Sequence, residues 1–448
     1  MIKKFVLSLI AAGAALSLNA ATVEQPEAEK TSKQERKERI KDHLEMHFKP
    51  YGFIRSYIFV DTRATKSLTE DMFFFLPLDR KLADNGQDLN AVTSWNFQAI
   101  TTRLGLDIKD YQVGGTSIEG KIEGDFYFLA KEGAAATFRM RQAYVKLGWA
   151  ELGRSGKSSL SLLVGQTWHP MAADMAHGIN LETGAPFSPF NRSAQVQFNA
   201  NLGEHVTLTA AALSHMQYKS NGPQGVTNKY MRHSLPEFYA GISVKAGGFL
   251  GRTGLSIMNL KPQYGFYNNT EDATDPLNGK KYNEWMTSFS PFIYLQYTKG
   301  IFQIKAKSVF AQSGEYMQLN NGYAATALKD DGISYEYTPV NASVNFLSFM
   351  IGKKAQGLLM VGYHKNLGTF KDVLPDKVYF SGNGFANINQ IVRITPGFIY
   401  NLGKLQFALE LNYTMVEYGK ITGLRVLPTE DLHWIDNYRI LTMVKFNF

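Results

Sequence analysis

Acidic and basic side chains recur at every second position in several otherwise apolar stretches of the chain. In 117–129, Glu119, Lys121, Glu123 and Asp125 alternate with isoleucine and phenylalanine. Alternate residues of a β-strand lie on opposite faces, so these charged groups share one face. Their spacing supplies no nucleophile held beside a base. The chemistry that this pattern predicts is ion pairing and the attraction of charged solutes.

Arginines follow the same alternation further along the chain. Arg139 and Arg141 lie opposite Phe138 and Met140, which places both arginines on one face. Val145 shares the parity of the arginines, so this assignment requires a β-bulge after Arg141 or an apolar patch on the inner face. Two roles are compatible for such arginines: an ion-pair ladder with nearby carboxylates, and a surplus of positive charge that favours anions.

The amino-terminal part of the chain has the pattern of an export signal. Lys3 and Lys4 precede an apolar run over 5–18 that ends in small residues, so we expect 1–21 to be a signal peptide. The chain has no cysteine and therefore no disulfide. In 22–48, charges of both signs interleave, and we expect a solvated helical or disordered periplasmic segment. Its apolar repeat is too sparse to predict a coiled coil.

From residue 49 onward, stretches with alternating apolar and polar side chains follow one another. A membrane-spanning β-strand needs ~9–11 residues, with apolar side chains towards lipid and polar ones towards the lumen. We therefore expect one domain over 49–448, an all-β transmembrane antiparallel barrel of about sixteen strands. The connections 261–285 and 313–340 leave room for two more. The predicted strands are 51–62, 94–108, 117–129, 137–149, 159–168, 193–202, 204–214, 236–246, 251–260, 286–298, 301–312, 341–352, 356–365, 391–401, 404–417 and 436–448.

The connections alternate between short and long, as expected for barrels with periplasmic turns and external loops. An arginine or lysine at the lipid midplane costs ~2–4 kcal/mol, which directs the charged strand residues to the lumen. The charged residues assigned to the pore lining are Arg55, Arg103, Glu119, Glu123, Asp125, Arg139, Arg141, Lys305, Lys307, Arg393 and Glu410.

One long connection, 169–192, follows the fifth predicted strand on the external side. It contains three prolines, has no period-2 alternation and is rich in apolar residues. We expect this third external loop to fold into the barrel and narrow the channel; an ordered surface loop is the alternative. Its candidate constriction residues are His169, Asp174, His177, Glu182 and Arg192.

The last predicted strand, 436–448, alternates apolar and polar residues and ends in Phe448. A terminal strand that ends in an aromatic residue is typical of outer-membrane barrels, in which it helps present the chain to the assembly machinery. We therefore expect the protein to lie in the cell outer membrane, in contact with its lipid.

Three motifs resemble those of a known family: Tyr51–Arg55 (YGFIR), Arg139–Tyr144 (RMRQAY) and Leu163–Trp168 (LVGQTW). The chain resembles Gram-negative porins over 50–448 and is similar, more narrowly, to DcaP-like porins over 50–200. The resemblance implies a homotrimer that takes up small, often anionic solutes such as dicarboxylates by passive diffusion. It also implies that Arg139 and Arg141 of the second motif line the wall near the constriction, and that Asp174, His177, Glu182 and Arg192 lie on the inserted loop.

Other functions remain as alternatives to a diffusion channel. A barrel esterase or protease needs a serine and a base, and Ser188 lies near His169 and His177 in the sequence. No G-x-S-x-G motif or other nucleophile signature accompanies them. An adhesive or structural barrel is a third alternative. We expect no catalysis, no cofactor, no metal and no nucleic acid partner.

Overall fold

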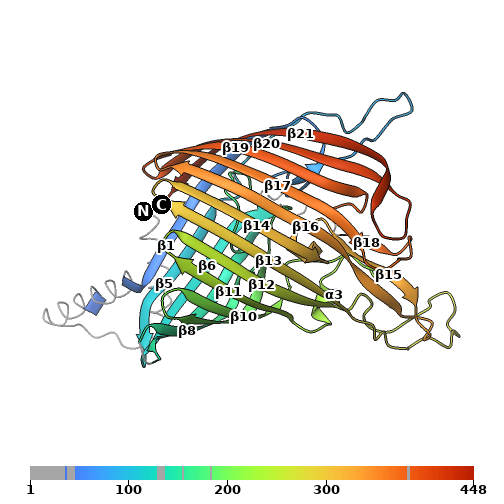
Figure 1. Cartoon of the computed structure of the whole chain (residues 1–448), viewed down its shortest axis with the longest axis horizontal. Helices are drawn as coiled ribbons and strands as arrows, with labels where there is room; N and C mark the ends of the chain where they lie inside the picture. Colours follow the sequence, from blue (N-terminus) through green and yellow to red (C-terminus); the bar gives the residue numbers. More distant parts are fainter. Residues whose placement is uncertain (1–35, 38–45, 129–136, 154–155, 182–183, 381–383) are drawn as a thin grey trace, which may run out of the picture.

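The structure is a computed structural model of the chain and describes residues 36–37, 46–128, 137–153, 156–181, 184–380 and 384–448. The described strands form a closed antiparallel β-barrel with strongly tilted strands (Figure 1). The predicted signal peptide, most of the charged segment after it, and Glu182 lie outside the described residues. The predictions for them stay predictions.

The described elements are almost all strands, as the period-2 patterning predicts. No helix among the described residues is long and apolar enough to cross a membrane. The elements are β1 (Phe48–Asp61), β2 (Thr65–Leu68), β3 (Phe73–Pro77), β4 (Ser94–Gln98), β5 (Arg103–Val113), β6 (Thr116–Phe128), β7 (Thr137–Leu152), β8 (Ser158–Trp168), β9 (Arg192–Leu202), β10 (Val206–Ser214), α3 (Lys229–Arg232), β11 (Glu237–Ala246), β12 (Phe249–Leu260), β13 (Met286–Lys299), β14 (Phe302–Gln312), the 3₁₀ turn η1 (Glu315–Met317), β15 (Gly322–Leu328), β16 (Tyr335–Gly352), β17 (Ala355–Thr369), β18 (Val378–Phe380), β19 (Ile388–Leu402), β20 (Leu405–Ile421) and β21 (Pro428–Asn447).

Sixteen strand positions make up the ring, which confirms the predicted number. The strands β4 and β5 occupy one position, because both pair with β1 on the same side. The strands β15 and β18 pair outside the ring, since β14 pairs directly with β16 and β17 with β19. Closure comes from β21, which returns to β1 with Arg55 opposite Lys445.

The outer surface of the ring is apolar. On β1, Ile54 and Ile58 are each 50% exposed, whereas Tyr57 and Phe59 on the other face are buried. Other strands repeat this alternation, with Phe292 and Tyr294 of β13 inside and Ile293 and Leu295 outside. A ring of strands leaves no unpaired edge, and an apolar outer belt suits contact with lipid chains.

Short turns and long connections lie at opposite ends of the barrel. The tight turns, at the end where Figure 1 marks the carboxyl terminus, use glycines with positive φ such as Gly203 and Gly403 (64° and 58°). At the other end, β15 and the extended β16 project beyond the ring (Figure 1). No additional pair of ring strands occurs in the described residues of 261–285 or 313–340.

Two strands show irregular side-chain parity, and the irregularity at Arg141 is the one predicted above. The second barrel strand is broken between β4 and β5, which lets both Trp95 and Leu104 face outwards. In β7, the register against β6 shifts so that Glu123 lies opposite Gln142 and Gly124 opposite Met140. Arg141 is therefore the extra residue of a β-bulge. Because of this extra residue, Val145 faces outwards although its spacing from Arg141 would place it on the inner face.

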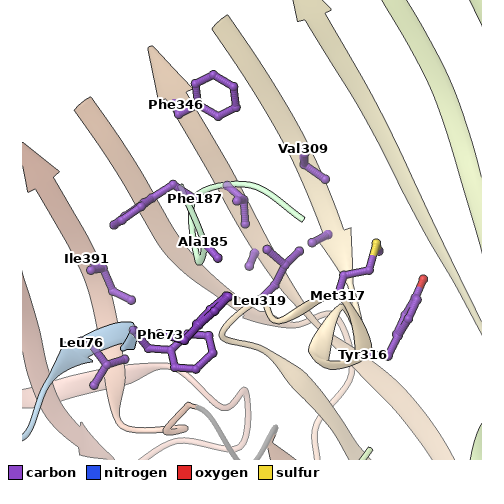
Figure 2. Packing of buried hydrophobic residues seen from close by; sticks show 14 of the residues in the cluster. Phe73, Leu76, Ala185, Phe187, Val309, Tyr316, Met317, Leu319, Phe346 and Ile391 are labelled. Carbon is purple, nitrogen blue, oxygen red and sulfur yellow. The ribbon is translucent and has the colours of Figure 1, made fainter. Parts of the chain in front are cut away.

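The inside of the barrel contains an apolar cluster that strand alternation does not predict. Figure 2 shows Phe187 and Ala185, from the connection between β8 and β9, in the same buried cluster as Ile391 and Phe346 of the wall. The hairpin of β2 and β3, in the first long connection, contributes Phe73 and other residues to the same cluster (Figure 2). Apolar side chains from loops thus pack against inward-facing apolar residues of the strands.

Candidate functional site

The register of four neighbouring strands brings charged residues into one row on the inner face. Phe53 of β1 lies opposite Arg103 of β5, and Arg103 lies opposite Asp125 of β6. Asp125 in turn lies opposite Arg139 of β7. Arg55 shares the face of Phe53, two residues away on β1. Because directly opposed residues of antiparallel strands point to the same side, these groups form a continuous basic wall.

Two carboxylates hold three arginines of the basic wall. Arg139 Nε lies 2.7 Å from Asp125 Oδ1, and Arg141 Nη1 lies 2.7 Å from Asp125 Oδ2. Arg141 Nε lies 2.8 Å from Glu123 Oε1, and Arg103 Nη1 lies 3.6 Å from Glu123 Oε2. Because Arg141 and both carboxylates are buried, removal of one partner leaves a charge that water cannot compensate.

Positive charge exceeds negative charge on this wall. Neither Arg55, Lys445 nor Arg192 forms an ion pair with any residue that the structure describes. Arg55 Nε donates to Thr101 Oγ1 at 3.0 Å. Arg192 is 1% exposed, its guanidinium carbon lies 4.7 Å from the centroid of the Trp168 ring, and its Nε and Nη1 have no hydrogen-bond partner among the described residues.

Towards the short-turn end the charges pair and become exposed. Lys121 Nζ lies 2.6 Å from Asp107 Oδ1, and Lys146 Nζ lies 3.2 Å from Glu119 Oε2. The Glu119 side chain is 51% exposed, so its ion pair is screened by solvent and contributes little to stability.

The connection 169–192 contacts the wall opposite the basic row. Lys307 Nζ of β14 donates to the carbonyl oxygens of Met171 at 2.5 Å and Asp174 at 3.1 Å. Arg252 of β12 forms an ion pair with the Asp174 carboxylate at 3.0 Å. The connection is therefore held by charged side chains from strands that are distant from β8 and β9 in the ring.

The same connection contacts β1, β16 and β20. Glu410 Oε2 of β20 accepts the backbone N–H of Ile179 at 2.5 Å. The Tyr57 hydroxyl of β1 donates to the Ile179 carbonyl at 2.9 Å, and the His177 N–H donates to Ser348 Oγ of β16 at 2.9 Å. These contacts satisfy backbone groups that would otherwise be unpaired when an irregular segment is buried.

Arg393 of β19 joins the two loops that pack inside the ring. Its Nη1 donates to the Ala185 carbonyl at 3.0 Å and its Nη2 to the Phe75 carbonyl at 2.6 Å. The rings of Phe74 and Phe187 lie over the guanidinium, with centroids 4.7 and 5.0 Å from its carbon. Arg393 is therefore buried between loops.

Three residues predicted to line a water-filled pore need a correction, because Lys307, Arg393 and Glu410 are buried beneath loops. Lys305 is partly exposed, and its Nζ donates to the Met175 carbonyl at 3.2 Å. Their inward direction follows from strand parity as predicted. Their environment differs because the loops carry backbone donors and acceptors that need partners, and the alternation of the strands contains no information about this.

A second buried cluster surrounds Glu237, the first residue of β11. Its carboxylate accepts from His169 Nε2 at 2.9 Å, His215 Nε2 at 2.5 Å and the Tyr316 hydroxyl at 2.8 Å, and also from Ser256 Oγ. The His169 Nδ1 accepts a backbone N–H at 3.0 Å, which leaves the proton on Nε2. The cluster ties together the segments that follow β8, β10 and β14.

Hydrolytic chemistry gains no support from these residues. Ser193 Oγ lies 3.0 Å from His215 Nδ1, and His215 contacts Glu237, so a Ser–His–Glu chain exists. All three side chains are buried and leave no approach for a substrate carbonyl. Ser188 is also buried, and its hydroxyl has no hydrogen-bond partner among the described residues.

The predicted constriction residues separate into different environments. Asp174 and His177 lie in the connection and contact the wall, whereas His169 belongs to the Glu237 cluster. Arg192 is the first residue of β9 and not part of the loop, because it pairs with Trp168 in the strand register.

Several partners of the charged residues do not follow from the alternation of the strands. Lys445 lies opposite Arg55 although its own strand was assigned correctly, and the pairing depends on ring closure. Thr101 lies in the break between β4 and β5, where alternation stops. Arg252 and Glu237 stand in strands whose other residues are largely apolar or small, and an isolated charge in such a strand was the available signal.

The closed ring of sixteen strands, its apolar outer belt and its charged inner wall have the architecture of a porin-type outer-membrane barrel. Among solved structures, the chain is similar to the outer membrane channel DcaP of Acinetobacter baumannii, with a TM-score of 0.64 and 17% sequence identity over 90% of this chain and 97% of that one. It is also similar to OmpF of Salmonella typhi, with a TM-score of 0.50 and 10% identity over 90% and 97% of the two chains. At these identities the likeness concerns the fold.

No protein-family profile matches the chain, and no curated protein sequence matches it significantly.

Proposed function

We propose that the protein is an outer-membrane porin that admits small hydrophilic, anionic solutes, such as dicarboxylates, by passive diffusion. The observation that carries the proposal is the charge balance of the basic wall. Arg55, Arg103, Arg139, Arg141 and Lys445 share this wall, and the carboxylates that pair with them are only Glu123 and Asp125 in the described residues. A cationic wall in a low-dielectric ring attracts anions and repels cations.

We further propose that the connection 169–192 forms the constriction. The loop anchors on β12, β14 and β16 support a position of this loop against the wall opposite the arginines, and its contacts with β20 and with Tyr57 of β1 support a path across the lumen. A solute would then pass between the loop and the basic wall. The loop would line one side of the passage and the basic wall the other. The negative groups of a solute would then turn towards the arginines.

The protein would act in the outer membrane as a homotrimer, with Phe448 presented to the assembly machinery during insertion. The outward-facing Ala210 and Ala212 of β10 support close approach of a neighbouring subunit, because small side chains permit tight contact between barrel walls. Chemical cross-linking of the protein in native outer membranes tests this proposal by the presence or absence of a trimeric species.

Liposome swelling tests the proposed transport. We expect purified protein in liposomes to admit a dicarboxylate faster than a diamine of the same length. A neutral sugar of similar mass serves as the size control. Equal rates for the dicarboxylate and the diamine would contradict the anion preference, and no swelling with any solute would contradict a diffusion channel.

A further inference from the structure

Three cations of the basic wall gather around one aromatic ring. The guanidinium carbons of Arg55 and Arg103 lie 4.8 and 5.0 Å from the centroid of Phe53, and Lys445 Nζ lies 5.5 Å from it. The strand register explains the cluster, because Arg55 lies opposite Lys445 and Phe53 lies opposite Arg103. The ring face attracts cations and accepts no strong hydrogen bond, so it collects the three groups without satisfying their donors.

This cluster has little opposite charge. Glu123, the carboxylate paired with Arg103, also accepts from Arg141 Nε at 2.8 Å and the Tyr51 hydroxyl at 2.9 Å. Arg55 Nη2 and Arg103 Nε have no hydrogen-bond partner among the described residues. Like charges held this close repel one another unless a counter-charge joins them.

We propose that Arg55, Arg103 and Lys445 form a discrete binding site for a compact oxyanion, a carboxylate or phosphate group, on the inner wall of the barrel. A guanidinium matches the two oxygens of such a group with parallel N–H donors, and a lysine adds a point charge. All three residues are partly exposed on the inner face, whereas the unpartnered Arg55 Nη2 and Arg103 Nε are buried within the cluster, so a solute in the lumen would approach through the other donors of these side chains. The inference rests on the proposed function only in requiring that the solute enters the lumen.

A discrete site differs from the general positive potential of the wall, because anion binding to the site saturates. A diffuse positive potential raises the local anion concentration without a fixed stoichiometry. A cluster of three donors on one ring binds one anion per protomer and prefers oxyanions to chloride, whose spherical shape gains nothing from a planar fork.

Isothermal titration calorimetry of the purified protein in detergent tests the proposal, with inorganic phosphate and acetate as probes and chloride for comparison. We expect saturable binding of phosphate and acetate, one per protomer, and at least tenfold weaker binding in Lys445→Met and Arg55→Gln. Phe53→Leu keeps every charge and removes the ring, and we expect it to weaken binding at least threefold.

The matched control is Lys353→Met, which removes one exposed positive charge in the turn between β16 and β17. We expect its affinity for phosphate to stay within twofold of the native value. Circular dichroism and heat-modifiable migration identify folded variants. Non-saturable heats in the native protein, or unchanged affinity in folded Lys445→Met and Arg55→Gln, would overturn the proposal.

Calorimetry and single-channel recording of the same protein together separate this inference from the proposed function. An anion-selective conductance without saturable binding would overturn the discrete site and keep the porin. Saturable phosphate binding by a barrel that does not conduct would support the site and contradict the porin.

Discussion

Glu410 of β20 accepts the backbone N–H of Ile179 at 2.5 Å. Ile179 belongs to the connection between β8 and β9, two strands that lie on the far side of the ring from β20. The next amide, that of Asn180, lies 3.3 Å from the other oxygen of the same carboxylate. One buried carboxylate thus fixes two backbone donors of the loop that we propose as the constriction. The loop position depends on wall residues far from its ends.

The Glu410 contact predicts a change of conductance. In Glu410→Ala, two buried N–H groups lose their acceptor, which costs about 1–3 kcal/mol each and favours displacement of the loop. We expect a larger and noisier single-channel current in a planar bilayer. Glu204→Ala, which removes an exposed carboxylate at a turn, is the control. A native current in Glu410→Ala would contradict the proposed constriction.

A glycine of β17 provides an independent test of the same loop. A Cβ at Gly362 would overlap Cγ of Phe187, whereas a Cβ at Gly357 of the same strand would meet nothing nearer than Ile351 Cγ2 at 3.6 Å. Overpacking costs about 1–3 kcal/mol, so Gly362→Ala should lower the thermal unfolding midpoint and displace the loop. Gly357→Ala should retain the native midpoint. Equal midpoints in both variants would show that Phe187 does not pack there.

Arg139 and Arg141 should differ in their effects. Arg139 is partly exposed and shares Asp125 with Arg141, so Arg139→Ala should lower anion preference with little loss of stability. Arg141 is buried between Glu123 and Asp125, and its loss leaves uncompensated charge worth about 3–5 kcal/mol. Reversal potentials and unfolding midpoints measured on both variants check this. Unchanged selectivity in Arg139→Ala would count against its place beside the solute path.

Glu315, in the 3₁₀ turn after β14, predicts a pH dependence. Burial raises the pKa of Glu315 to about 7, although the Ser220 hydroxyl, which donates at 2.7 Å, favours the charged form. The pKa of the unfolded chain is about 4.5, so the folded state binds this proton more tightly. The contribution to stability is complete below about pH 4.5 and is lost as the pH rises through about 7.

Urea unfolding monitored between pH 5 and pH 8.5 measures this effect. The native protein should be less stable at the higher pH, and Glu315→Gln should remove that part of the difference, because the amide cannot ionise. If Glu315→Gln and the native protein lose the same free energy over this interval, Glu315 is already ionised in the folded state.

The sequence alone predicts the ring well. Most strand limits agree with the prediction, because a wall with lipid on one side imposes strict alternation. The exceptions are β16 and β21, which begin at Tyr335 and Pro428, well before the predicted starts at 341 and 436. The bulge at Arg141 could be inferred because Val145 would otherwise carry an apolar side chain to the inner face. Each of these features depends on local parity, which a single strand contains.

The inside of the barrel could not be predicted in the same way. Strand alternation assigns Arg393 and Lys307 to the pore lining. The loops that cover them come from distant parts of the chain. A signal was present on β1, where Tyr57 and Phe59 place aromatic rings on the inner face. Aromatic residues on a face expected to be polar indicate that something apolar packs there, but alternation does not identify it.

The most direct test of the central claim is the reversal potential of single channels of the native protein in a planar bilayer under a potassium chloride gradient. The basic wall predicts stepwise openings with a reversal potential of the sign for chloride permeation. A reversal potential of the opposite sign, or a bilayer that stays silent, would contradict an anion-selective porin.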